Sequence, residues 1–206
     1  PWNTTQNDRN ACTNSPGCLV AAKLYQRYED GNYLSDAKKL YEYVVNNSYN
    51  ADGRVEEPPL TYTQGTFGEA CRQLYHITQE QSYMAIAEQV ISYAFTSTRC
   101  TNKGFLRDEG TDMNQSIFKA VLIPYAVNLV LDDAASGTVR NTLTLKLQDN
   151  AEALRKNMDR TQWPAMYCNY YWGSSFNSAN IASMGAQASG ASLMEGVARL
   201  EAAQAK

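Results

Sequence analysis

Neighbouring carboxylates are the side chains of this sequence that could share acid–base or nucleophilic chemistry. Glu56 and Glu57 follow each other in a turn-rich stretch, and Asp132 and Asp133 form the one Asp-Asp pair in the chain. Such chemistry requires surroundings that raise the pKa of one carboxyl while its neighbour stays ionised, and the residues around Glu56 and Glu57 predict none. Asp132 and Asp133 follow an apolar stretch and precede Ala-Ala-Ser-Gly, so we interpret them as a solvated turn or a helix cap.

Histidine and cysteine offer little for metal or thiol chemistry. His76 is the single histidine, so a zinc site built from Cys and His is not expected, and His76 is interpreted as structural. Five cysteines leave at least one unpaired. Cys12 and Cys18 flank a turn-rich segment and could form a disulfide, with five free thiols as the alternative. We therefore expect neither a metal nor a cofactor.

Aromatic and amide side chains point instead to a neutral ligand. Charged residues make up only 19% of the chain, whereas Tyr alone reaches 14. Flat rings pack against the C–H faces of pyranoses and amides hydrogen-bond hydroxyl groups, so this composition suits neutral polyhydroxy ligands. The aromatic stretch at 163–172 has the alternative of filling a core. It contains Trp163, Tyr167, Tyr170, Tyr171 and Trp172.

Net charge and hydropathy argue against two classes of partner. With 18 basic and 21 acidic residues the formal net charge is −3, which leaves no basic footprint for nucleic acid. The most apolar run, 120–131, is interrupted by Pro124 and Asn128 and is shorter than the ~20 residues needed for a membrane span. The polar, lightly charged composition favours an extracytoplasmic protein, and 206 residues suffice for one domain with a sizeable core.

A repeat of 50 residues predicts the elements that position these side chains. The pattern Leu-Tyr, seven residues, Tyr-apolar, two residues, Ala occurs at 24–37 and again at 74–87. Each copy reads as a helix, a short polar turn and a returning helix with one apolar face. No convincing strand is found. Helices are expected near residues 17–28, 33–46, 65–78, 81–97, 115–131, 140–158 and 184–204.

The length of the repeat favours an all-α fold of paired helices joined by substantial loops. Long loops are expected near 47–64, 98–114 and 159–183, and loops of this length in a compact helical domain are more often functional than idle. Hairpins with long loops on one side describe an α/α toroid, whose loop-bearing face holds the site. An open α-solenoid with variable loops is the alternative.

Four segments resemble glycoside hydrolase family 76, the α-1,6-mannanases and their fungal cell-wall relatives. Residues 60–67, Leu-Thr-Tyr-Thr-Gln-Gly-Thr-Phe, resemble the family signature Trp-Thr-Tyr-Asn-Gln-Gly. Residues 10–16 look like its Asn-Ala-Ile-Ser-Asn-Gly-Pro, and residues 104–120 look like its acidic loop leading into Phe-Lys-Gly. Residues 185–190 look like its closing Ala-Gln-Thr-Ser. The four occur in the family's order along the whole chain, which makes the resemblance fairly specific.

The resemblance implies an (α/α)6 toroid of twelve helices. Residues 1–206 would form the C-terminal portion of this single domain, with about seven of the twelve helices. The family's catalytic residues are adjacent aspartates on an earlier helix, one nucleophile and one acid/base of a retaining mechanism. That pair would lie before Pro1, so we expect the toroid to be incomplete at its N-terminus and this chain to hold no catalytic residue. The complete protein is then expected to hydrolyse α-1,6-mannan, with the preceding segment as partner of this one.

The same resemblance suggests which side chains contact the glycan. The loop 52–58 is similar to a family loop whose carboxylate contacts substrate; Glu57 takes that place, and Glu56 is a near alternative. Tyr62 would stack and Gln64 would bind hydroxyls, or both would fix the loop to the helix start. Asp112 would contact ligand or cap a helix. The six expected binding residues are Trp2, Asn14, Glu57, Tyr62, Gln64 and Asp112, converging on one end of the toroid.

Departures from the family pattern leave a second function open. Thr63 stands in place of Asn, Ala120 in place of Gly, and Pro58 follows Glu57 where the family has Gly. These changes favour an altered glycan preference or weakened catalysis. The alternative to an enzyme is a non-catalytic glycan-binding or cell-wall-associated relative. In both cases the expected ligand is α-mannan or a related oligosaccharide.

Overall fold

The computed structural model describes residues 10–56, 58–176 and 183–205. Within these ranges the helices are α1 (Ala11–Tyr28), α2 (Gly31–Asn47), α3 (Thr61–Thr78), α4 (Gln81–Thr96), α5 (Phe118–Val130), α6 (Gly137–Asn157) and α7 (Met184–Gln204). A 3₁₀ helix, η1 (Gln115–Ile117), precedes α5. Strands β1 (Thr101–Asn102) and β2 (Phe105–Leu106) form a small hairpin between α4 and α5.

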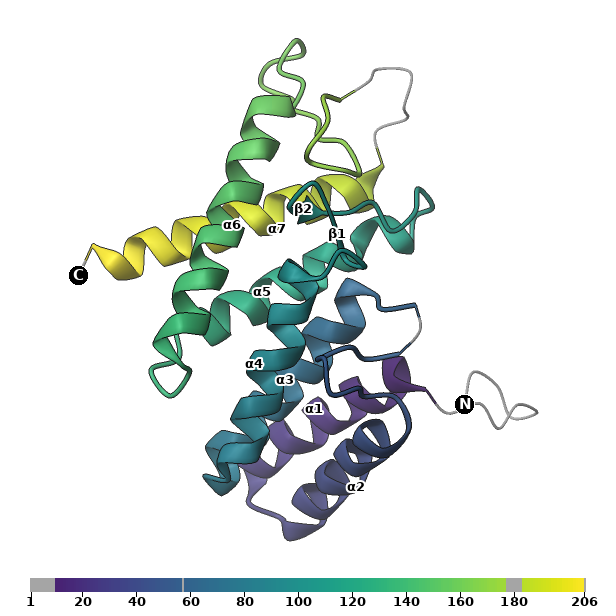
Figure 1. Ribbon diagram of the computed structural model, residues 1–206, viewed down its shortest axis with the longest axis vertical. Coiled ribbons are helices and arrows are strands. Elements are labelled where there is room, and N and C mark those ends of the chain that lie inside the picture. The colour runs from purple at the N-terminus through teal and green to yellow at the C-terminus, as the bar shows by residue number, and fades with distance from the viewer. Residues whose placement is uncertain (1–9, 57, 177–182, 206) are drawn as a thin grey trace.

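The helices form two layers. In the first layer α1, α3, α5 and α7 lie side by side in chain order; in the second, α2 packs on α1, α4 on α3, and α6 against α5 and α7 (Figure 1). Apolar side chains between the layers make up the main core, which includes Phe67 and Ile91. A smaller cluster under the α1–α2 hairpin includes Leu19 and Leu74. The helical content and hairpin arrangement confirm the all-α prediction.

The predicted 50-residue repeat corresponds to two hairpins of the same build. The helices α1 and α3 both end in a left-handed residue, Glu29 at φ 58° and Gln79 at φ 61°, and each of these donates its backbone N–H to the carbonyl of a tyrosine four residues earlier. Two-residue connections then lead into α2 and α4. A left-handed cap of this kind satisfies carbonyls at the helix end and reverses the chain, so the repeated Leu-Tyr motif marks a repeated turn.

All first-layer helices begin at the same end of the molecule. The long connections lead into α3, α5 and α7, and their described parts, 48–56, 58–60, 97–114 and 158–176, gather toward the side where these helices begin (Figure 1). The connections at the opposite end are short. We call the side on which α1, α3, α5 and α7 begin the long-loop end, and it is the end at which the sequence predicts a site.

Glycines let the first-layer helices approach closely. A Cβ at Gly65 of α3 would lie 2.7 Å from the Cα of Leu122 in α5, and a Cβ at Gly68 would lie 2.5 Å from Cγ1 of Ile91 in α4. Distances under 3.0 Å are too short for a real contact. The spacing of α3 from both neighbours therefore depends on the absence of these two side chains.

Several details differ from the sequence-based expectations. Helix α1 begins at Ala11 instead of near 17 and contains Pro16, because the side chain of Asn10 caps it by accepting from the N–H of Thr13 at 3.0 Å. The β-hairpin was not expected, since its strands have two residues each. Its turn uses left-handed backbone at Lys103 (φ 50°) and Gly104 (φ 88°).

The cysteines are all free thiols, so the Cys12–Cys18 disulfide is not formed. Among the described helices none is both long and apolar enough to cross a membrane.

Candidate functional site

Two glutamates hold the starts of neighbouring first-layer helices at the long-loop end. A carboxylate oxygen of Glu56, from the connection after α2, accepts from the backbone N–H of Ala11, the first residue of α1. Glu109, from the connection after α4, accepts from the N–H of Thr61 at 2.7 Å and from its hydroxyl. A carboxylate is favourable at a helix N-terminus because the free N–H groups there carry partial positive charge. Each long connection thus reaches back to the start of the preceding first-layer helix.

Two glutamines anchor the long connections from inside the helices. Gln64, the fourth residue of α3, is fully buried; its Oε1 accepts from the N–H of Val55 at 2.6 Å, and its Nε2 donates to the carbonyls of Gly53 and Val90 at 2.9 and 3.0 Å. Gln187, the fourth residue of α7, exchanges hydrogen bonds of 2.9 and 3.0 Å with the backbone of Cys168. Of the two roles expected for Gln64, the structure supports fixing the loop, because its amide is buried and engaged.

Tyr62 lies two residues before Gln64 and has the surroundings of a ligand-facing ring. Its centroid is 4.4 Å from that of Phe118, the first residue of α5, and both rings are half-buried. Burial raises the pKa of the Tyr62 phenol to about 12, with a further contribution from a hydrogen bond to the Cys12 thiol. The phenol is therefore neutral at ordinary pH and can donate a hydrogen bond. Together the two rings form an aromatic surface that spans the starts of α3 and α5.

The other predicted binding residues have mixed placements. Asp112 is exposed at the long-loop end, where its Oδ1 accepts from the N–H groups of Asn114 and Gln115 at 2.8 and 2.9 Å and thereby caps η1. Asn14 is half-buried in α1 and donates to the carbonyl of Asn10 at 2.7 Å. Trp2 and Glu57 lie outside the described residues. Convergence of all six is therefore not tested, but the four described ones belong to first-turn or loop positions at this end.

A buried lysine beside Phe118 was not among the predicted site residues. Lys119 is 5% exposed; its Nζ donates to the carbonyl of Tyr170 and lies 4.1 Å from the centroid of the Trp172 ring. Burial lowers the pKa of Lys119 to about 8, although the carboxylates of Glu109 and Asp108 raise it. Burial likewise raises the pKa of Glu109. The lysine thus connects α5 to the aromatic stretch in the α6–α7 connection.

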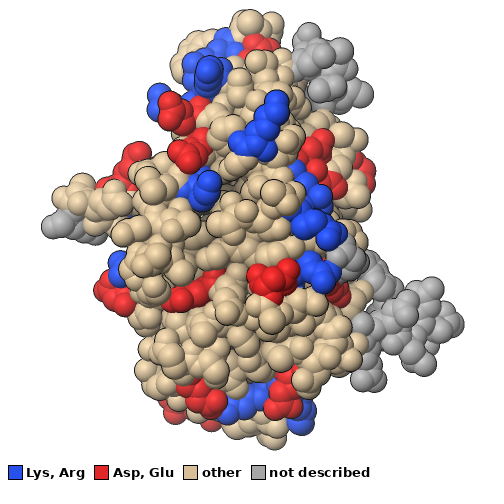
Figure 2. All heavy atoms as spheres, in the orientation of Figure 1, with Lys and Arg blue, Asp and Glu red and all other residues tan. Residues whose placement is uncertain are grey.

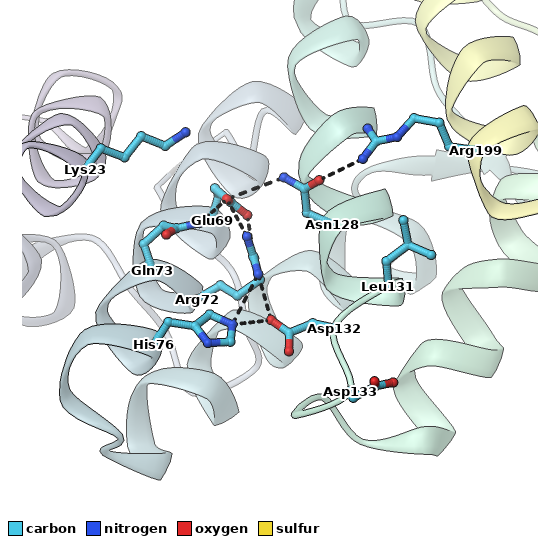
Figure 3. A pocket seen from close by; sticks show the side chains of 10 residues that line it. All are labelled: Lys23, Glu69, Arg72, Gln73, His76, Asn128, Leu131, Asp132, Asp133 and Arg199. Atoms are coloured by element: carbon cyan, nitrogen blue, oxygen red, sulfur yellow. Dashed lines mark hydrogen bonds and ion pairs between the residues drawn. The ribbon is translucent and has the colours of Figure 1, made fainter. Parts of the chain in front are cut away.

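A hollow of about 500 Å³ lies toward the other end of the first-layer helices (Figure 3). At its floor the buried carboxylate of Glu69 accepts two bonds of 2.9 Å from Arg72 and one of 2.7 Å from Gln73. Arg72 also donates to Asp132 at 2.7 Å, and Asp132 pairs with His76. These groups satisfy one another and tie α3 to the end of α5.

The hollow corrects the interpretation of Asp132 as solvated. Its side chain is 6% exposed and ion-paired with Arg72, whereas that of Asp133 is 94% exposed and lies 3.0 Å from Arg140, as expected for a turn. Burial raises the pKa of Asp132, but hydrogen bonds from His76 and Arg72 outweigh it and leave that pKa below its usual range. The aspartates are therefore structural, and they lie at the end opposite Tyr62.

Charge and metal ligands give little further definition to the site. Acidic and basic side chains are interspersed over the face shown in Figure 2, with wide uncharged areas between them. No cluster of three or more His, Cys, Asp or Glu side chains suited to a metal ion is found in the described ranges. What the long-loop end leaves accessible among the predicted residues is the half-buried ring of Tyr62, paired with Phe118, and the exposed carboxylate of Asp112.

Solved structures with this architecture include enzymes that act on mannan. An inactive variant of the α-1,6-mannanase of Salegentibacter sp. HEL1_6, with two adjacent aspartates replaced by alanine and α-1,6-mannotetrose bound, is 27% identical with a TM-score of 0.85, over 93% of this chain and 59% of that chain. A second inactive variant, bound to α-1,6-mannotriose, is 26% identical with a TM-score of 0.88, over 97% and 62%. The Lin0763 protein of Listeria innocua shares the fold at 24% identity with a TM-score of 0.82, over 94% and 56%.

The match runs along nearly all of this chain but not along its relatives. The chain spans about three fifths of the length of the mannanase structures, which are helical toroids, in agreement with the predicted fold class. A search of curated proteins finds no significant match. The family model described as glycosyl hydrolase family 76 matches residues 1–205. The chain therefore belongs to glycosyl hydrolase family 76.

Proposed function

We propose that this chain forms the glycan-binding part of a family 76 hydrolase that acts on α-1,6-linked mannan. The observation that carries the proposal is the similarity, at 26–27% identity, to a mannanase whose structures contain α-1,6-linked mannose oligomers. A glycan of this kind is neutral and rich in hydroxyl groups. The rings of Tyr62 and Phe118 and the exposed carboxylate of Asp112 supply stacking surface and acceptors for such a ligand.

For the mechanism we propose retention, with two carboxyl groups supplied from outside residues 1–206. A retaining glycosidase needs two carboxyls about 5–5.5 Å apart, one to attack the anomeric carbon and one to protonate the leaving oxygen. Within the described ranges, Glu56 and Glu109 are occupied as helix caps at the long-loop end, and Asp132 is ion-paired at the other end. The relative's inactive variants, which lack two adjacent aspartates, are consistent with a pair of that kind.

The ring of Tyr62 provides a direct test of the binding site. In a longer protein that includes the preceding segment, Tyr62→Ala should weaken binding of α-1,6-mannotetraose by up to about 3 kcal/mol, because a stacked aromatic anchor is lost. Tyr62→Phe keeps the ring and should retain most of the affinity. Isothermal titration calorimetry measures both. Equal affinity for Tyr62→Ala and the parent protein would remove Tyr62 from the site.

We propose an extracytoplasmic location for the protein, because a mannan polymer is encountered outside the cytoplasm and the chain is polar and lightly charged. Cell fractionation of the source organism tests this directly.

A non-catalytic glycan-binding relative is the second candidate, favoured by the occupied carboxylates at the long-loop end. It predicts that the longer protein binds mannotetraose without hydrolysing it.

A further inference from the structure

The α6–α7 connection is the longest between the described helices, and side chains from three helices hydrogen-bond to the backbone of its aromatic stretch. We define residues 167–172 as the aromatic segment. Gln187 of α7 bonds to the backbone of Cys168, and Asn157 at the end of α6 donates to the carbonyl of Trp172 at 2.9 Å. The third anchor comes from α5, where Lys119 donates to the carbonyl of Tyr170. The first two are neutral amides, whereas the third is a buried amine.

Burying the charged amine of Lys119 costs free energy, which makes a lysine unfavourable as a purely structural anchor. Its side chain is almost completely buried, and burial lowers its pKa to about 8. Burial penalises the charged form of a lysine, so its pKa is lower in the folded chain than in the unfolded chain. The folded chain is therefore less stable below pH 8, where the buried lysine is charged, than above the pKa of the unfolded lysine, where it is neutral. The charged group must therefore be supported by local interactions, and the ring of Trp172 at 4.1 Å supplies one.

The groups that face Lys119 come from two connections. Glu109 and Asp108, from the α4–α5 connection, and the thiol of Cys168, from the aromatic segment, act on its charge. The same Glu109 caps α3 at Thr61, one residue from Tyr62. Lys119 itself follows Phe118, whose ring contacts Tyr62. Lys119 therefore contacts the aromatic segment from the residue that directly follows Phe118 of the ring pair.

We propose that the charged ammonium of Lys119 is a positioning group, which holds the aromatic segment 167–172 against the start of α5 as one wall of the glycan site. Trp172 is buried and receives the cation on its ring, so the half-buried rings of the same segment are set in place through it. The placement of the segment follows from the structure alone. Its use as a wall of the glycan site rests on the function proposed above.

The charge on Lys119 can be followed through Trp172, since a cation over an indole ring changes its fluorescence. Replacing Trp2 and Trp163 by Phe leaves Trp172 as the single tryptophan. In this background the emission should change with a midpoint near pH 8, and Lys119→Met should abolish that transition. Lys156→Met, which removes an exposed lysine of α6, is the matched control and should titrate like the parent. A transition that survives in Lys119→Met, or a parent without one, overturns the proposal.

Stability and binding separate positioning from packing. Because burial penalises the charged lysine, Lys119→Met should unfold at an equal or higher temperature at pH 7, yet hydrogen exchange in residues 167–172 should become faster. Slower or unchanged exchange, or a lower unfolding temperature, would contradict the role. In the longer protein, Lys119→Met should weaken α-1,6-mannotetraose binding about tenfold, and unchanged affinity would overturn the placement of the segment in the site. If the parent binds no mannotetraose, the proposed function fails, while the fluorescence and exchange results still decide the role of Lys119.

Discussion

At the long-loop end, a side chain expected to bind ligand can serve the fold instead, and Gln64 is the clearest case. The Gln-Gly motif carried the resemblance to the family, and an amide preceding a cleft suggested contact with hydroxyls. In the structure the Gln64 amide hydrogen-bonds to the backbone N–H of Val55 and to the carbonyls of Gly53 and Val90. A buried amide that pairs with three backbone groups fixes a loop, and a motif residue can be required for that reason alone.

The buried ion pair between Asp132 and Arg72 gives a prediction for a single side chain. Asp132→Asn should lower the free energy of unfolding at pH 7 by about 2 to 3 kcal/mol, because it breaks a buried ion pair with Arg72. The folded pKa of Asp132 is depressed, so its contribution is present above the unfolded value and is lost as pH falls through the folded one. Urea unfolding of the two proteins at pH 7 and near pH 3 measures the effect.

Asp133→Asn is the control, since that side chain is almost fully exposed and should matter by less than about 0.5 kcal/mol. Equal losses for the two substitutions would contradict the assignment of Asp132 to a buried network. So would an Asp132→Asn effect of the same size in acid and at neutral pH.

Among the helices, the hairpins and the starts of α4 and α7 could be predicted, whereas the starts of α1 and α3 could not. The 50-residue repeat specifies two turns, each of which begins with a left-handed residue, because the signal is local in sequence. Helix α3, in contrast, begins four residues before its predicted start. Its backbone N–H at Thr61 is satisfied by Glu109, 48 residues further along the chain. A cap supplied from so far away leaves no local pattern, and the same is true of Glu56 at α1.

The buried lysine was missed for a related reason. The stretch Phe-Lys-Ala was noted only as part of the family resemblance, and a lysine at the start of an apolar helix reads as solvent-exposed. Its burial depends on the α6–α7 connection folding over it, which no local periodicity predicts. The aromatic stretch at 163–172 was recognised as either stacking surface or core. Trp172 belongs to the core, whereas Trp163 is exposed, and stacking of Trp163 on a sugar stays a prediction.

Packing between elements gives a prediction for Gly65. A methyl group there would lie 2.7 Å from the Cα of Leu122, so Gly65→Ala should push α3 and α5 apart and cost about 1 to 3 kcal/mol. At Gly31, in the first turn of α2, a Cβ meets nothing within 4 Å. Gly31→Ala should therefore be neutral or stabilising by up to about 1 kcal/mol. Chemical denaturation of the two variants decides, and equal stabilities would contradict the close approach.

In the whole molecule, the parallel first layer brings the described candidate site residues to one end. Because α1, α3, α5 and α7 begin on the same side, their free N–H groups, their preceding long connections and the rings of Tyr62 and Phe118 are brought together there. The short connections leave the other end to the ion-paired network around Arg72. The family model matches residues 1–205, so the helices that form both ends belong to the family 76 domain.

We propose that residues 1–206 bind and position the glycan while the catalytic carboxyl pair lies outside them. Hydrolysis of α-1,6-mannan oligosaccharides by purified 1–206, beside a protein extended through the preceding segment, tests this most directly. Loss of a catalytic carboxylate removes several powers of ten in rate, so the short chain should show no turnover while the extended one hydrolyses the substrate. Turnover by residues 1–206 at a rate comparable to that of the extended protein would contradict the account.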